Sequence, residues 1–276
     1  MTVDLHIHTT ASDGRLSPVE IITAAMEAGL SHIAITDHDT VDGLLELMNS
    51  GVTLPSTLSV IAGIELSSDL PEWEVHILGY NIDIHNQKLQ NQLQLLIAHR
   101  HERTQQMIGK LHELGYVITY QQVVKLAEKA TAIGRPHIGK ALVEQGYFPN
   151  VSEAFTQLIG KNGPAYVPHY KLTPSQVIAL IKEANGIPVL AHPGLIKNDE
   201  IVMEIIHLGI QGLEVYHPTH SEAEIRKYLT MANNHRLLIT GGSDFHGISG
   251  RFPETLGVFT LPMTLAHQLE GSIIHK

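Results

Sequence analysis

The 276-residue sequence contains no cysteine, and this absence removes several chemistries at once. Disulfides, iron–sulfur clusters, thiolate zinc sites and a cysteine nucleophile are all excluded. Any metal ion that the chain holds must therefore bind to histidine, to carboxylates or to neutral oxygen ligands.

Basic residues and long apolar runs are also scarce. The 18 Lys and Arg are outnumbered by 28 Asp and Glu, which gives a formal net charge of −10. We expect no stable DNA binding, because this requires clustered cations that displace counterions from the phosphates. No run reaches the ~18 consecutive apolar residues of a membrane helix, and residues 1–6 do not begin a signal peptide. We expect a globular cytoplasmic protein without a membrane partner, and the pattern indicates no particular oligomeric state.

The chain is instead rich in apolar residues, at 43%, and in histidine, with 19 copies. Short β-branched segments alternate with helical segments in both halves, which predicts an α/β fold with parallel strands joined by helices. About seven such units favour a barrel over a doubly wound sheet. The expected strands are residues 3–7, 32–36, 60–64, 75–80, 187–191, 212–216 and 237–240.

The alternation stops between about residues 85 and 168. Four helices are expected there, at residues 87–114, 121–129, 137–145 and 152–158. We therefore assign residues 1–85 and 169–276 to the barrel, and residues 86–168 to an inserted helical cap domain. Ser17 before Pro18 and Thr173 before Pro174 predict the starts of two barrel helices.

Side chains of the metal-ligand type gather at the ends of the expected strands. His6 and His8 are two apart in a strand, so both imidazoles point to the same side. The C-terminal ends of parallel barrel strands meet on one face, which brings distant residues together. Nine such residues lie at or beside strand ends: His6, His8, Asp13, His38, Glu65, His76, His192, Asp244 and His246. At about four to six ligands per ion, with bridging carboxylates, they imply two or three divalent metal ions.

These residues resemble the motifs of the polymerase and histidinol phosphatase (PHP) family of metal-dependent phosphoesterases. The resemblance lies in residues 4–8, 13–14, 36–39, 63–65, 76, 191–193 and 243–246. It implies a distorted (β/α)7 barrel and three ligand sets: His6, His8, Glu65 and Asp244; Glu65, His76 and His192; and Asp13, His38 and His246. The residues expected to act in catalysis are Asp13, His38, Glu65, His192, Asp244 and His246.

The insertion is similar to the helical cap of one PHP branch, which contains nucleoside 3′,5′-bisphosphate phosphatases and 5′-to-3′ exoribonucleases. The similarity lies in residues 134–139, 144–147 and 163–168. It implies that Arg135 and His137 bind a substrate phosphate, and a guanidinium beside a helix start also suits an anion on physical grounds. His217 is a further candidate for substrate binding. Basic candidates for an entrance are Lys161, Lys171 and Arg251.

Together these features predict hydrolysis of nucleotide phosphate esters by a metal-bridging hydroxide. The expected reaction is removal of the 3′-phosphate from a nucleoside 3′,5′-bisphosphate such as pAp, or release of a 5′ nucleotide from short RNA. Imidazole and carboxylate ligands favour Mn²⁺, with Fe²⁺, Zn²⁺ or Mg²⁺ as alternatives. The acid that protonates the leaving group stays open between a metal-bound water, His217 and Asp37.

Three other functions are compatible with parts of this pattern. A histidinol-phosphate phosphatase would use the same scaffold, but the cap motifs disfavour it. An amidohydrolase-type C–N hydrolase uses similar histidines and an aspartate, yet it does not need Asp13, His38 and His246. A non-catalytic PHP binding module should have lost ligands, and all nine are present. Phosphoester hydrolysis is therefore the favoured interpretation.

Overall fold

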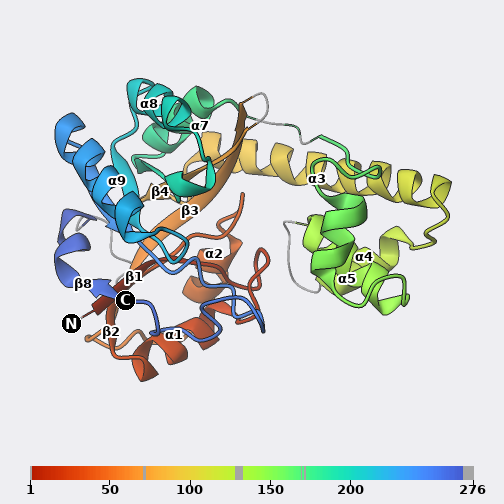
Figure 1. Ribbon diagram of the computed structural model, residues 1–276. Coiled ribbons are helices and arrows are strands. Elements are labelled where there is room, and N and C mark those ends of the chain that lie inside the picture. The colour runs from red at the N-terminus through yellow and green to blue at the C-terminus, as the bar shows by residue number, and fades with distance from the viewer. Residues whose placement is uncertain (1, 71–72, 128–132, 169, 171, 270–276) are drawn as a thin grey trace. The chain divides into compact units, whose positions relative to one another are not determined.

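The computed structural model describes residues 2–70, 73–127, 133–168, 170 and 172–269. The described strands form one curved β-sheet (Figure 1). The sheet has the strand order β7-β6-β5-β4-β3-β2-β1-β8. Its strands are β1 (Thr2–Ile7), β2 (Leu30–Ile35), β3 (Ser59–Leu70), β4 (Trp73–Tyr80), β5 (Ile187–Leu190), β6 (Gly212–Tyr216), β7 (Leu238–Gly241) and β8 (Leu261–Pro262). A parallel bridge between Ile7 and Phe245, just beyond β7, joins the two sides and nearly closes a barrel.

The expected barrel of mixed α/β class is confirmed, but the strands are not all parallel and β8 is additional. Strand β4 runs antiparallel to both β3 and β5, because only residues 71–72 separate it from β3 and leave no room for a crossover helix. Strand β8 pairs antiparallel with β1, and its two residues are too few to show a period. As a result His76, near the start of β4, lies opposite Ser67 at the edge where β3 ends.

Helices follow most of the parallel strands in the chain. They are α1 (Pro18–Glu27), α2 (Asp42–Asn49), α7 (Pro174–Glu183), α8 (Asp199–His207) and α9 (Glu222–His235), with short 3-10 turns at Pro193–Leu195, Met263–Leu265 and His267–Leu269. The expected cap of α1 is present: Ser17 Oγ accepts from Glu20 N, and the Glu20 carboxylate accepts from Ser17 N at 2.7 Å. Thr173 caps α7 in the same way. No helix among the described residues is long and apolar enough to cross a membrane.

The barrel interior is filled by aliphatic side chains from several strands. Val3 and Leu5 of β1 pack with Ile61, Leu78 and Val189, and all five are almost fully buried. Each such side chain contributes roughly 1.5–3 kcal/mol to folding. This core packs the strands together, and the polar residues of the candidate site lie at the ends of these strands.

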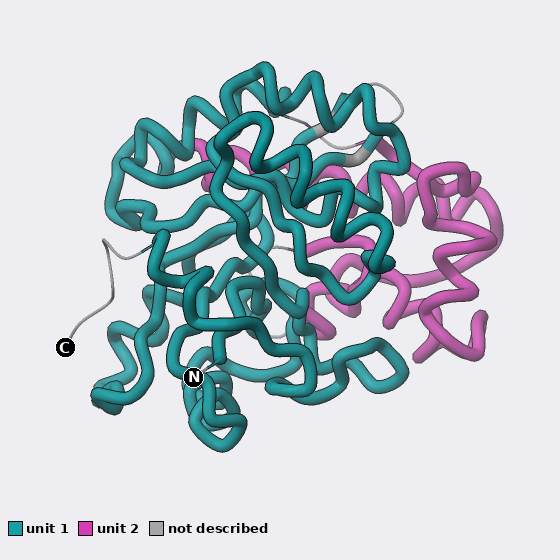
Figure 2. The backbone as a smooth tube through the Cα atoms, turned by 60° about the vertical axis from the view of Figure 1, so that its left-hand side comes forward, with its two compact units in different colours: residues 1–91, 171–276 teal, residues 92–170 magenta. Residues whose placement is uncertain are grey.

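The chain divides into two compact units, residues 1–91 with 171–276 and residues 92–170 (Figure 2). Helix α3 (Gln87–Glu113) starts in the first unit and continues into the second. The second unit also contains α4 (Tyr120–Ala127), α5 (Arg135–Glu144), α6 (Val151–Ala154) and a π-helical turn at Phe155–Ile159. Residues 128–129 of one expected helix lie outside the described residues. A role as a cap for the barrel site stays a prediction.

Candidate metal centre

Glu65, in the middle of β3, is completely buried among imidazoles. Its Oε1 atom lies 2.9 Å from His76 Nδ1 and 3.0 Å from His192 Nε2. Its Oε2 atom lies 2.9 Å from His38 Nδ1. One carboxylate therefore faces histidines from three different parts of the chain, and it is placed to bridge two ions.

His6, in β1, and His8, just after its end, direct their ring Nε2 atoms to the same place, as expected. Their Nε2 atoms are 3.1 Å apart, and both lie within 3.4 Å of Glu65 Oε2. Asp244 Oδ1 is 3.2 Å from His8 Nε2 and 3.5 Å from His6 Nε2. The four side chains of the first implied ligand set thus lie together.

Asp13 and His246 approach the cluster beside His8. Asp13 Oδ1 lies 3.1 Å from His246 Nε2, and the rings of His8 and His246 stack with centroids 4.1 Å apart. Ligand atoms of these three residues and of His38 all lie within 4.8 Å of one another. His8 therefore lies in two of these groups of ligand atoms, whereas the resemblance to the PHP family placed it in only one ligand set. The structure therefore brings all nine predicted side chains into one continuous cluster.

The chemistry of this cluster fits divalent metal ions. Three overlapping groups have their ligand atoms within 4.8 Å: His6, His8 and Asp244; His38, Glu65 and His76; and the group around Asp13. His8 Nδ1, His38 Nδ1 and Glu65 Oε2 are buried without a hydrogen-bond partner among the described residues, although ligand-type atoms surround them. Buried polar atoms are normally satisfied, so bound cations account for the arrangement better than protein contacts do.

Neighbouring histidines lower the pKa values of the carboxyl groups in the cluster. Burial alone would raise the pKa of Glu65, but the neighbouring His38 and His76 hold it well below its usual value. The carboxyl pKa values of Asp13 and Asp244 are also lowered well below the usual range, despite burial, with His246 as the main opposing charge. These three carboxylates are ionised and ready to bind cations.

The pKa values of two imidazoles are raised, in contrast to those of the carboxylates. Burial would lower the pKa of His6, yet the carboxylates of Glu214 and Glu65 raise it well above its usual value. The pKa of His246 is raised against burial by Asp13 and Asp244. The raised pKa values favour the protonated form of both rings in the metal-free protein, and a bound metal would have to displace these protons.

The backbone around the ligands adopts conformations that ordinary residues rarely use. His192 and Asp244 have φ values of 28° and 52°, in the left-handed region. Gly242, just before Asp244, lies so close to His6 that a Cβ atom there would overlap the His6 backbone and Cβ. Glycine at this position lets the segment after β7 approach β1 and brings Asp244 to His6.

Three buried carboxylates beyond the ligand set support it, and sequence reasoning assigned none of them this role. Glu214 contacts His6 Nδ1 at 2.9 Å and accepts from His192 N at 2.7 Å. Asp4 Oδ1 accepts from Ser243 N at 2.8 Å, and burial raises its pKa to about 6. A charged residue in the otherwise apolar strand β6 was the available signal for Glu214.

Asp37, the third of these carboxylates, organises the loop that carries Asp13. It accepts from Thr9 N and Thr9 Oγ1, both at 2.7 Å, and from Ser12 Oγ at 2.6 Å. The side chain is almost completely buried. Its oxygens are thus engaged as acceptors in a structural network.

His217 and Arg251 face the outer oxygen of Asp244. Arg251 donates from Nη2 to Asp244 Oδ2 at 2.6 Å, and its side chain is 43% exposed. His217 Nε2 is buried 3.7 Å from the same oxygen and has no hydrogen-bond partner among the described residues. His217 Nδ1 pairs with Thr219 Oγ1 at 2.8 Å. The Nε2 side of this ring is directed at the cluster.

Arg135 and His137 belong to the second unit, at the start of α5. The Arg135 guanidinium lies over the rings of Phe155 and Tyr166. His137 is buried, and its Nδ1 accepts from Gly134 N at 3.1 Å. Their role in phosphate binding stays a prediction. Of the other entrance candidates, Lys161 is exposed in this unit and Lys171 lies outside the described residues.

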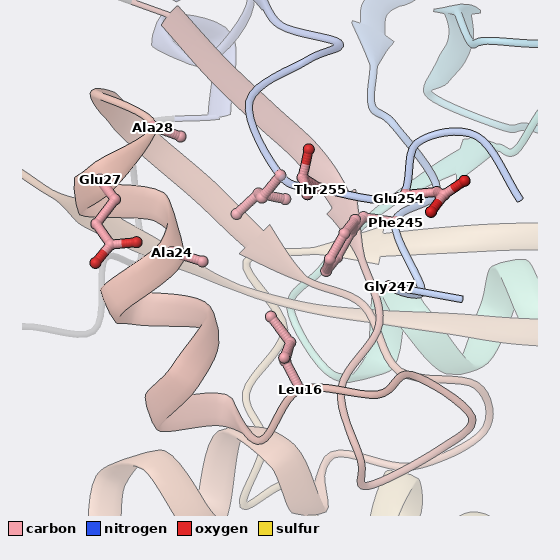
Figure 3. Close-up of a pocket in the computed structure, with 9 residues that line it drawn as sticks. Leu16, Ala24, Glu27, Ala28, Phe245, Gly247, Glu254 and Thr255 are labelled. Carbon is pink, nitrogen blue, oxygen red and sulfur yellow. The ribbon is translucent and has the colours of Figure 1, made fainter. Parts of the chain in front are cut away.

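A pocket of about 420 Å³ lies elsewhere on the barrel unit, between α1 and the segment after β7 (Figure 3). Leu16, Ala24 and Phe245 point into it, and Glu27 and Glu254 are among its lining residues. None of the nine ligand-type residues lines this pocket. It is separate from the metal cluster, although Phe245 stands between Asp244 and His246 in the sequence.

The similarity of this chain to known proteins is consistent with a metal-binding site at this cluster. Residues 4–186 match the PHP domain family. The 3′,5′-nucleoside bisphosphate phosphatase of Chromobacterium violaceum is 30% identical, over 90% of this chain and 89% of its own length. The 5′-3′ exoribonuclease Rnm of Escherichia coli is 31% identical, over 88% and 84%.

A third relative acts on a different ester. The phosphoribosyl 1,2-cyclic phosphate 1,2-diphosphodiesterase of Eggerthella lenta is 29% identical, over 92% of this chain and 97% of its own length. Among solved structures, a protein from Bifidobacterium adolescentis assigned to the metal-dependent phosphoesterases superposes with a TM-score of 0.86. It is 32% identical, over 97% of this chain and 94% of that protein. The chain therefore belongs to the PHP domain family and is a hydrolase acting on phosphoester bonds.

Proposed function

We propose that this hydrolase acts on small phosphorylated nucleotides or on the 5′ end of short RNA, with Mn²⁺ as its preferred ion. The observation that carries the proposal is the cluster of six imidazoles with the carboxylates of Asp13, Glu65 and Asp244, in which buried ligand atoms lack hydrogen-bond partners among the described residues. The bisphosphate phosphatase and the exoribonuclease among its relatives support nucleotide substrates.

We assign the ligands as three sets, with Glu65 shared between the first two. His6, His8 and Asp244 complete the first set, His76 and His192 complete the second, and Asp13, His38 and His246 form the third. Bound divalent ions would lower the pKa of water and offset negative charge on phosphate oxygens. Three such ions against three carboxylates leave a centre of roughly +3, which suits an anionic substrate on an acidic chain.

The residues around Asp244 Oδ2 are proposed to orient the phosphate. His217 Nε2 is buried and directed at the cluster, and Arg251 uses one donor on Asp244 while its exposed side chain offers others. A guanidinium in this position can bind a phosphate oxygen and Asp244 together. Arg135 and His137 remain proposed phosphate contacts from the helical unit, which is proposed to act as the cap.

His217 is a better candidate than Asp37 for the proton donor to the leaving oxygen. The Asp37 carboxylate accepts three hydrogen bonds from Thr9 and Ser12, so its oxygens already hold the loop. Both of its oxygens are therefore engaged as acceptors from the protein, and neither is directed at a leaving group. His217 can carry a proton on Nε2 and faces the cluster.

A panel of substrates tests the proposal. The Mn²⁺-loaded protein is incubated with pAp, 5′-AMP, a short 5′-phosphorylated RNA, a phosphoribosyl 1,2-cyclic phosphate and histidinol phosphate. We expect phosphate release from pAp or nucleotide release from RNA, and loss of this activity in the Asp13→Asn variant. Turnover of the cyclic phosphate or of histidinol phosphate alone would move the assignment to those esters. Metal-loaded protein that hydrolyses none of the five would contradict it.

A further inference from the structure

Glu214 is a buried carboxylate in a strand that is otherwise apolar. Strand β6 reads Gly-Leu-Glu-Val-Tyr, and Leu213 and Val215 on either side of Glu214 are completely buried. Glu214 is itself 0% exposed. Burying a carboxylate is costly unless charged or hydrogen-bonded partners compensate it, so its contacts show why this position is charged.

Those contacts reach two different members of the ligand cluster. Glu214 Oε1 accepts from the ring Nδ1 of His6 at 2.9 Å, and Glu214 Oε2 accepts from the backbone N–H of His192 at 2.7 Å. The first bond holds a side chain, and the second holds a backbone in the left-handed region, at φ 28°. Both carboxylate oxygens are thus committed to the cluster.

The bond to His6 decides which nitrogen of that ring faces the metal. With the proton on Nδ1 and directed at Glu214, Nε2 is free of hydrogen when the ring is neutral and points at Glu65 Oε2, 3.4 Å away. A carboxylate on the far nitrogen of a histidine fixes its tautomer and increases its basicity as a ligand.

The bond to His192 fixes the second ligand through its main chain. His192 Nε2 lies 3.0 Å from Glu65 Oε1, whereas His6 Nε2 lies beside Glu65 Oε2. Glu65 therefore contacts the Nε2 atoms of both histidines, on the side where the ions are proposed to bind. Glu214 contacts the same two residues on the other side, His6 through its ring and His192 through its backbone N–H. His6 and His192 belong to different ligand sets in the proposal above.

We propose that Glu214 is a positioning residue that couples the two metal positions bridged by Glu65. It holds His6 and His192 in the geometry that accepts ions, and it does not itself contact ion or substrate. Loss of its charge and second acceptor weakens both positions together, while the position formed by Asp13, His38 and His246 is affected less. This inference rests on the ligand sets proposed above.

The test compares Glu214→Gln with Glu222→Gln, the same chemical change at an exposed site on α9. A glutamine keeps the shape of the side chain but has only one acceptor oxygen, so one of the two bonds is lost. Mn²⁺ binding to metal-free protein is followed by calorimetry. We expect the affinity of two positions to fall about 10- to 100-fold in Glu214→Gln, and no change in the control.

Three further readouts separate positioning from a general loss of fold. Circular dichroism of metal-free Glu214→Gln should match the wild type, and ¹⁵N NMR should show a change in the His6 ring protonation pattern. Hydrolysis should return when Mn²⁺ is raised by the same factor, with the substrate KM unchanged. If Glu214→Gln does not fold, Glu214→Asp, which keeps the charge but shortens the reach, should fold and show the same two-position loss.

Wild-type affinity in the Glu214 variants would overturn the inference, and so would a loss confined to one position. Both outcomes leave the proposed function standing, because the wild-type protein still binds metal and hydrolyses substrate. Wild-type protein that binds no divalent ion would instead overturn both proposals.

Discussion

Arg251 donates from Nη2 to Asp244 Oδ2 at 2.6 Å, on the opposite side of the carboxylate from the oxygen that faces His6 and His8. One aspartate thus joins the buried ligand cluster to an exposed guanidinium. Under the proposed function, this pair would lie between the metal positions and the substrate phosphate. Removal of Arg251 should therefore affect substrate binding more than metal binding.

We expect Arg251→Ala to raise the KM for the substrate about tenfold, because one charge-assisted hydrogen bond to phosphate is lost. The Mn²⁺ content should stay at the wild-type value. Steady-state kinetics and elemental analysis measure the two effects. Arg226→Ala, at an exposed i,i+4 pair on α9, is the matched control and should change neither. An unchanged KM in Arg251→Ala would remove this residue from the substrate site.

Asp13→Asn should remove the third ligand set. Asp13 Oδ1 lies 3.1 Å from His246 Nε2, and an amide is a much weaker ligand than a carboxylate. We expect one ion fewer per chain and a fall in kcat of about 100-fold or more. Native mass spectrometry and phosphate release measure the two quantities. Asp83→Asn, in an exposed loop, serves as control. Wild-type metal content and activity in Asp13→Asn would refute the third position.

Metal binding should strengthen as pH rises, with release of protons. Carboxylates raise the pKa values of His6 and His246 in the metal-free protein, which favours protonated rings, and a bound metal would displace these protons. Calorimetry of Mn²⁺ binding near pH 7, in two buffers with different ionisation heats, should reveal about one to two released protons. Identical heats in the two buffers would contradict this assignment.

The stability of the metal-free protein should follow pH in the opposite direction. A histidine with a raised folded pKa stabilises the fold fully below its unfolded value of about 6.5. That contribution is lost as pH rises through the folded pKa. Urea unfolding of metal-free protein should therefore show a contribution from His6 and His246 that declines above neutrality, and His246→Gln should reduce this decline. An identical pH profile in His246→Gln would contradict it.

Gly242→Ala should damage both the fold and the metal centre. Its Cβ atom would overlap His6, so the segment after β7 must move away from β1. We expect the free energy of unfolding to fall by about 1–3 kcal/mol, with weaker Mn²⁺ binding. Gly109→Ala is the control, because a Cβ there meets nothing within 4 Å and removal of a helical glycine stabilises by up to ~1 kcal/mol. Equal stability of the two variants would contradict the close approach.

Much of the barrel could be predicted from the sequence, because buried strands and helix caps leave local signals. The Ser17–Pro18 and Thr173–Pro174 starts are examples. The direction of β4 was predicted wrongly: parallel strands were expected, but β4 runs antiparallel to both neighbours, and strand periodicity carries no information on orientation. The antiparallel pairing of β4 with β3 is also what brings His76 to the edge where the cluster lies. The position of this residue was therefore expected from a strand whose direction was predicted wrongly.

The nine candidate ligands could be found in the sequence because histidines and carboxylates stand out at strand ends. Glu214 was missed for a physical reason: its function depends on a bond to His6, which is distant in the sequence. Arg251 was named as an entrance candidate, but its contact with Asp244 was not predicted, because the path of a loop sets that partner. The partners of such residues follow from the tertiary fold, and for Glu214 the sequence shows only a charged residue in an otherwise apolar strand.

The most direct test of the central claim is a titration of metal-free wild-type protein with Mn²⁺, in which bound ions and phosphate release from pAp are counted on the same samples. We predict two or three ions per chain, with hydrolysis that appears only once the positions bridged by Glu65 are filled. Full hydrolysis by protein that retains no metal, or by a Glu65→Gln variant, would contradict the account.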